Sequence, residues 1–175
     1  MILKPQDILV LFKLVARGAR PWTFNELALE LGMSPSEVHA AVKRAVRSRL
    51  AIESAGQIRP HIRNLLEFVE YGIQYVFVPE VGALTRGLPT AHAAPPMSKA
   101  FKDEELPPVW SDPEGEVRGL SFSPLYKSVP QAVRVDPELH ELLAMLDAVR
   151  AGRAREKKWA IKELTKRLLR YDKSQ

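Results

Sequence analysis

Basic and short polar side chains recur at helical spacing in the run SPSEVHAAVKRAVR, residues 34–47. Residues four apart, such as Lys43 and Arg47, lie on one side of a helix. Ammonium and guanidinium groups bind phosphate oxygens, and short polar side chains can reach the edges of bases. The run therefore predicts contact with a nucleic acid through a set of candidate residues: Ser34, Ser36, His39, Lys43, Arg44 and Arg47.

The helix that must carry these residues has a start signal and an apolar face. Ser34 is its expected N-cap, Pro35 occupies the first position, where a missing amide costs nothing, and Glu37 completes a capping box. Apolar residues at helical spacing predict its buried stripe, which comprises Val38, Ala41, Val42, Ala45 and Val46. The basic residues then fall on the opposite side. A solvated basic face on an ordinary bundle helix is the alternative interpretation.

A shorter helix is expected immediately before it. Thr23 and Glu26 repeat the capping-box pattern ahead of Leu27 and Leu31. Gly32 ends this helix, because glycine enters the left-handed region without a steric penalty. Two helices joined by a tight turn, with cations on the second, predict a helix-turn-helix that reads DNA.

The flanking segments extend this pattern. An amphipathic helix is predicted over residues 4–17, closed by Gly18. After Arg49, residues 50–53 and 57–59 alternate between apolar and polar, with a turn over residues 54–56, which is typical of a short hairpin. Pro60 ends its second strand, and Arg59 adds a further candidate phosphate contact. This order of elements predicts a winged helix-turn-helix over residues 1–60.

Two segments resemble known families. The run MSPSEVHAAVKRAVRSRLA is similar to the recognition helix and wing approach of MarR-like bacterial transcriptional regulators, which implies a DNA-binding regulator. The run GALTRGLPTAHAAPPM, residues 82–97, resembles a segment of an uncharacterised bacterial winged-helix family and implies no activity. Within it, Arg86, Thr90 and His92 are candidates for contacting a partner or ligand. Pairing of Arg86 with a carboxylate of the acidic middle is the favoured alternative.

Charge is unevenly distributed along the 175 residues, whose net charge is +5. Residues 1–60 carry a net charge of +4, residues 61–150 carry −5, and residues 151–175 carry +6. Cationic side chains attract DNA phosphates whatever the base sequence of the DNA. This charge distribution therefore favours DNA binding by the two ends of the chain. A basic terminal helix that serves only solubility is the alternative for the C-terminal segment.

The remaining chain predicts a mainly helical α+β fold in three segments: residues 1–60, 61–135 and 136–175. A helix is expected from Ile62 to Gly72 and a strand over residues 74–78. Seven prolines between residues 80 and 126 predict an irregular packed segment with a short strand over residues 116–122. Asp136 and Pro137 begin an αα-hairpin that breaks at Ala151. Its apolar stripes fit either a second subunit or the same chain, and the sequence leaves this open.

Several classes of protein are not expected. The chain has no cysteine, which excludes disulfides and thiolate zinc sites and fits a reducing compartment. No apolar run reaches the ~20 residues that span a bilayer, and Asp7 interrupts the first apolar run, so we expect no membrane partner and a cytoplasmic protein. The histidines show no metal-ligand spacing, and no phosphate loop or nucleophile motif occurs. We expect no enzyme, no metal and no cofactor.

The leading hypothesis is a sequence-specific transcriptional regulator that binds double-stranded DNA. A symmetric operator needs two copies, so a homodimer is expected. The alternative is a protein-interaction module, such as an antitoxin-like partner that neutralises an enzyme encoded beside it and also regulates its own operon. A third interpretation is a winged scaffold that no longer touches DNA.

Overall fold

The N-terminal helices begin and end where the sequence predicts. In the computed structural model, which describes residues 1–103 and 105–175, α1 spans Pro5–Arg17, α2 spans Phe24–Leu31 and α3 spans Pro35–Arg47. Gly18 and Gly32 follow α1 and α2 with φ of 72° and 62°, angles that favour glycine. The expected hairpin is present as β1, Ala51–Ser54, and β2, Gln57–Pro60, paired antiparallel.

A helix replaces the strand predicted over residues 74–78. α4 spans Ile62–Tyr71, as expected, and α5 continues over Ile73–Val76. The amides of Tyr75 and Val76 donate to the carbonyl of Gly72, at 3.0 and 3.2 Å. The prediction was wrong because packing decides this segment: Ile73 is fully buried and α5 contacts α7, Pro137–Ala151, whereas Tyr75 and Val76 stay exposed.

The proline-rich middle contains a small closed barrel of three strands. β3 spans Val81–Pro89, β4 spans Pro108–Ser111 and β5 spans Val117–Phe122. β3 is antiparallel to both others, and β4 and β5 are parallel. β5 confirms the short strand predicted over residues 116–122, but the prediction of an otherwise irregular segment was wrong for β3 and β4. Two short 3-10 turns, η1 (Ala91–Ala93) and η2 (Met97–Lys99), lie between β3 and β4 in the chain. The helix α6 (Val129–Val133) follows β5 and contacts α2 and α7.

Glycines let the barrel close, because its strands approach one another too closely for side chains. A Cβ built on Gly119 would overlap the carbonyl oxygen of Pro107, and one on Gly87 would overlap that of Trp110. Backbone atoms cannot swing aside as the end of a flexible side chain can. Gly87 and Gly119 are therefore packing requirements of the barrel.

Replacing Gly119 with alanine is expected to lower the free energy of unfolding by about 1–3 kcal/mol, the usual range for overpacking. Gly82→Ala in β3 is the matched control. A Cβ there would meet only Ser121, at an ordinary 3.5 Å, so no loss and a gain of up to about 1 kcal/mol is expected. Urea titrations of both variants measure the difference, and equal stabilities would contradict the close approach at Gly119.

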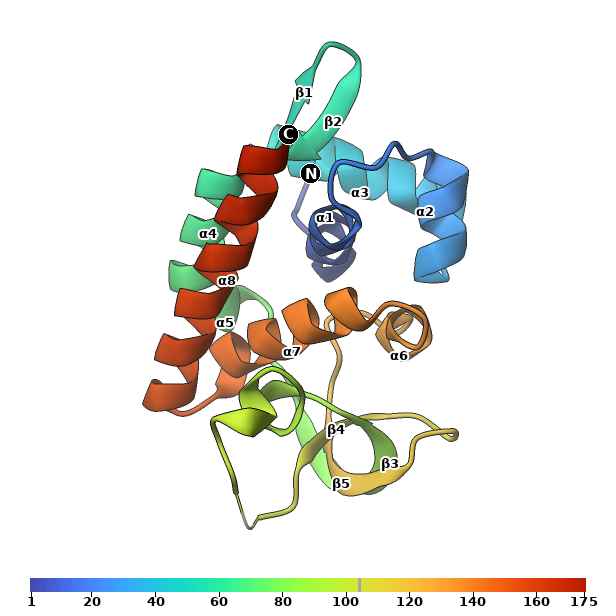
Figure 1. Cartoon of the computed structure of the whole chain (residues 1–175). Coiled ribbons are helices and arrows are strands. Elements are labelled where there is room, and N and C mark those ends of the chain that lie inside the picture. Colours follow the sequence, from blue (N-terminus) through green and yellow to red (C-terminus); the bar gives the residue numbers. More distant parts are fainter. Residues whose placement is uncertain (104) are drawn as a thin grey trace.

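The predicted αα-hairpin is formed by α7 and by α8, Ala154–Ser174, and it packs on its own chain. The apolar stripe of α7 is almost completely buried and consists of Leu139, Leu142, Leu143, Leu146 and Val149. Figure 1 shows α7 between α1 and the barrel, with α8 running beside α4. The stripe of α7 is thus covered within one chain, and it is not available as the surface of a second subunit.

One hydrophobic core runs through all three predicted segments. Phe12 of α1, Trp110 of β4 and Leu143 of α7 belong to the same buried cluster. Lys13 adds a polar link, since its ammonium group lies 2.6 Å from Asp136 at the start of α7 and 2.9 Å from Glu30 of α2. α7 therefore holds the N-terminal helices and the barrel together.

Candidate nucleic-acid interface

Reciprocal caps fix the start of α3. The amide of Glu37 donates to the Ser34 hydroxyl at 3.2 Å, and the Ser34 amide donates to the Glu37 carboxylate at 2.7 Å. Thr23 and Glu26 make the same pair of hydrogen bonds at the start of α2. Ser34, a candidate contact residue, thus uses its hydroxyl as the N-cap and lies 3.1 Å from the Ser36 hydroxyl.

The outer face of α3 carries most of the predicted contact residues. Ser36, His39, Lys43 and Arg47 are exposed. Of the predicted inner stripe, Val38, Ala41, Val42 and Ala45 are buried and Val46 is half-buried. Neither Lys43 nor Arg47 takes part in an ion pair within residues 1–103 and 105–175. Their charges are therefore not neutralised within this part of the chain.

Arg44 does not belong to this face, and its predicted outward position was wrong. Its guanidinium contacts the Asp7 carboxylate of α1 through Nη2 at 2.6 Å and Nε at 2.8 Å. Asp7 is fully buried, and it also accepts the amide of Lys4 at the N-cap of α1. The hydrogen bond to Asp7 raises the pKa of Arg44. Arg44 therefore fastens α3 to α1, and its charge is already compensated.

Aromatic rings from the start of α2 pack against α3, a feature that the sequence did not suggest. The Phe24 ring stacks on His39 with centroids 3.5 Å apart, and Trp22 meets Phe24 edge-on at 5.2 Å. Phe24, His39, Lys43 and Ile58 help to line a groove of about 330 Å³ between α3 and the hairpin. The stack fixes the orientation of His39, which the sequence placed among the candidate contact residues.

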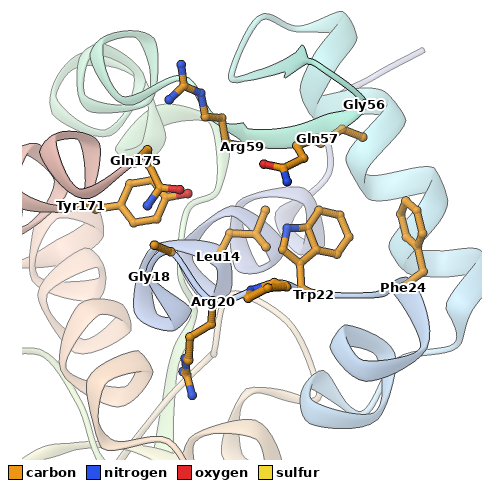
Figure 2. Close-up of a pocket in the computed structure, with 13 residues that line it drawn as sticks. Leu14, Gly18, Arg20, Trp22, Phe24, Gly56, Gln57, Arg59, Tyr171 and Gln175 are labelled. Carbon is orange, nitrogen blue, oxygen red and sulfur yellow. The ribbon is translucent and has the colours of Figure 1, made fainter.

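The hairpin stands beside α3, with its tip in a tight turn. Ala55 and Gly56 both have positive φ, 52° and 73°, as a two-residue hairpin turn requires. Arg59 lies at the base of β2, half-buried. It borders a cavity of about 260 Å³, shown in Figure 2, in which Trp22 and Gln57 face Tyr171 from α8. Burial raises the pKa of Tyr171 to about 12.

The structure does not bring Arg86, Thr90 and His92 together. Arg86 is exposed on β3, and its predicted carboxylate partner is not found among the described residues. His92 lies half-buried between two carboxylates, 3.8 Å from Asp103 and 3.7 Å from Glu156. Thr90 is fully buried, so its prediction as a partner or ligand contact was wrong.

Thr90 instead belongs to a buried polar network around Asp147 that the sequence did not reveal. The Asp147 carboxylate accepts the Thr90 hydroxyl, the Trp110 indole N–H and the Arg150 guanidinium, each at 2.7 Å. Arg150 also donates to the carbonyl of Phe77, at 2.8 Å. The network joins α7 to the barrel and to the chain after α5. Arg150 is three residues from Asp147, but Trp110 and Thr90 are 37 and 57 residues away, so no local motif predicts their contacts.

Acid is expected to remove a stabilising contribution of Glu37. Hydrogen bonds from the Ser34 amide and then from the Tyr126 hydroxyl, at 2.8 Å, hold the pKa of Glu37 below its ordinary value. The folded state therefore favours the carboxylate, and this stability is present above the ordinary glutamate pKa and is lost as pH falls through the lower folded-state pKa.

Tyr126→Phe should reduce the difference in unfolding free energy between neutral and acidic pH, and urea titrations at several pH values measure it. Tyr75→Phe, at an exposed position, is the control and should leave the difference unchanged. An unaltered pH profile in Tyr126→Phe would contradict the assignment.

The described part of the chain has no group of three or more histidine and acidic side chains placed to hold a metal ion. Within the same residues, none of the helices combines the length and apolar character that crossing a bilayer requires.

Comparison of the chain with protein-family models, with curated proteins and with solved structures found no match.

Proposed function

We propose that residues 1–60 form a winged helix-turn-helix that binds double-stranded DNA, and that the protein is a sequence-specific transcriptional regulator. One observation carries the proposal: the exposed face of α3 presents uncompensated cations beside a hairpin that projects from the body (Figure 1). A helix of this kind fits the major groove, and a hairpin beside it reaches the neighbouring backbone.

The side chains divide by reach and chemistry. Ser36 and His39 lie in the N-terminal half of α3 and are assigned to base edges, where short polar side chains hydrogen-bond. Lys43, Arg47 and Arg59 are assigned to phosphates, and Ser34 orients the helix as its cap. One copy carries one such helix, so a symmetric operator would be bound by two copies, which makes a homodimer part of the proposal.

Removing two phosphate contacts tests the proposal. Lys43→Ala combined with Arg47→Ala is expected to weaken binding to duplexes of any sequence. The slope of log affinity against log salt should become shallower by about two units, since each contact contributes about 0.9. Fluorescence anisotropy with a labelled fragment of genomic DNA from upstream of the gene, over a salt series, measures both.

Lys99→Ala is the matched control, because Lys99 is an exposed cation in η2, outside the N-terminal segment. Its affinity and salt slope should equal those of the wild type. Equal effects of the control and the double variant would show non-specific attraction to a basic protein. Unchanged binding in the double variant would remove α3 from the interface.

A further inference from the structure

The outer face of the barrel carries two cross-strand pairs of unusual composition. Leu84 of β3 lies directly opposite Leu120 of β5, and two residues on, Arg86 lies directly opposite Arg118. Both arginines are exposed, and the leucines are 43% and 36% exposed. Directly opposed residues project from the same face of a sheet. We call this surface, with the adjacent Val81, the barrel face.

The arginine pair is not compensated by carboxylates of the described residues. Arg86 and Arg118 form no ion pair there, although directly opposed like charges destabilise a sheet. Four other arginines of the middle and C-terminal segments do contact carboxylates: Arg134, Arg150, Arg153 and Arg167. Arg63, Arg155 and Arg170 form no ion pair among the described residues, but none of them directly opposes another arginine across a sheet. The pair therefore has a stability cost that no contact in the described chain offsets.

A depression with apolar and charged lining adjoins the leucine pair. Its volume is about 190 Å³, and its apolar part is formed by Val81, Leu106, Leu120 and Phe122, of which Val81 and Leu106 are 62% and 52% exposed. The lining also includes Glu156 and Arg153, and Arg153 pairs with the lining carboxylates of Asp103 and Glu105. This volume suits one apolar side chain of a partner. The arginine pair, two residues along the strands from the leucine pair, suits carboxylates that bind in bidentate fashion.

We propose that the barrel face docks an acidic segment of another protein, with carboxylates on Arg86 and Arg118 and an apolar side chain in the adjoining hollow. A nucleic acid fits less well, because its continuous row of phosphates would also pass the carboxylates of Asp103, Glu105 and Glu156 in the hollow, whereas a short segment can place its carboxylates on the arginine pair alone. A second copy of the chain fits less well too, since a symmetric contact centred on this face would oppose the arginine pair to itself. Figure 1 places the barrel at the opposite end of the molecule from the hairpin, so docking here leaves α3 free.

A random dodecapeptide display library selected against the full chain tests the proposal. Enriched peptides should carry acidic residues next to a large apolar one. Their affinity should fall about tenfold or more in Arg86→Gln and in Arg118→Gln, the expected size for loss of a charge-assisted hydrogen bond. Arg155→Gln, at an exposed arginine of α8, is the matched control and should bind as the wild type does. The thermal midpoint of Arg118→Gln should not fall, because a like-charge contact is relieved.

Three results would overturn the proposal. Enriched peptides that lack acidic residues would show that the barrel face does not recognise carboxylates. So would peptides whose affinity is unchanged in both Arg86→Gln and Arg118→Gln. Loss of duplex DNA affinity in Arg118→Gln would make the face a DNA contact. A dimer in sedimentation that Arg118→Gln splits would make the occupant a second copy. The Lys43→Ala and Arg47→Ala variant should keep its peptide affinity, so failure of DNA binding and failure of peptide docking are separate outcomes.

Discussion

Asp147→Ala is expected to lower the free energy of unfolding by about 3–5 kcal/mol, the range for removing one partner of a buried ion pair. The substitution would leave the Arg150 guanidinium, whose side chain is 4% exposed, without its carboxylate. It would also orphan the donors of Thr90 and Trp110. The loss is a large part of the ~5–15 kcal/mol by which domains are ordinarily stable. Chemical denaturation at neutral pH measures it.

Two further variants serve as a conservative comparison and as a surface control for Asp147→Ala. Asp147→Asn keeps one acceptor but replaces the other by a donor, so its loss should be smaller than that of alanine. Asp172→Ala, at an exposed carboxylate of α8 without an ion pair among the described residues, should change stability by less than about 0.5 kcal/mol. A loss below about 1 kcal/mol in Asp147→Ala would mean that the network does not hold α7 to the barrel.

Asp7→Ala is expected to cost about 3–5 kcal/mol by the same mechanism, at the other end of the molecule. It would leave Arg44, whose side chain is 11% exposed, without a carboxylate. It would also remove the acceptor of the Lys4 amide at the N-cap of α1. The predicted DNA contacts of α3 are untouched by the change, so the loss should appear in stability before it appears in affinity.

A double-mutant cycle separates the interaction energy between Asp7 and Arg44 from the effect of replacing either residue alone. Arg44→Met added to Asp7→Ala removes the uncompensated charge, so the double variant should be more stable than Asp7→Ala alone. Simple addition of the two single losses would show that Asp7 and Arg44 act independently. That outcome would return Arg44 to the list of candidate phosphate contacts.

The N-terminal segment was predictable because its signals are local. Thr23 with Glu26, and Ser34 with Glu37, are capping pairs three residues apart, and Gly32 stands where the left-handed backbone requires it. Each signal works within one helical turn, so a single sequence contains it. The αα-hairpin was predictable for the same reason, from the Asp136 cap and the spacing of its leucines.

The barrel was mostly missed because its determinants are distant in sequence. Position 87 must be glycine because the Trp110 carbonyl lies where a Cβ would be, and the Pro107 carbonyl has the same effect at position 119. Neither constraint can be seen from residues nearby in the sequence. The apolar alternation over residues 74–78 favoured a strand locally, but the burial of Ile73 against α7 decided for a helix. Tertiary packing overrides propensity in such short segments.

The candidate site was partly predictable for the same physical reason. Helical spacing placed Ser36, His39, Lys43 and Arg47 outward, as observed, but periodicity alone could not show that Asp7 draws Arg44 inward from 37 residues away. Likewise, Arg118 opposes Arg86 only through the register of β3 and β5. Side-chain pairing across elements is where reasoning from one sequence stops.

The central position of α7 has a consequence for how this protein unfolds. α7 contacts α1 on one side and η1 and α5 on the other, so neither the N-terminal helices nor the barrel can lose order without exposing part of its buried surface. Segments that share such an element melt as one cooperative unit rather than in sequence. The N-terminal segment is therefore not an independent unit on a flexible linker, and cutting the chain after Pro60 would expose the surface of α1 that α7 covers.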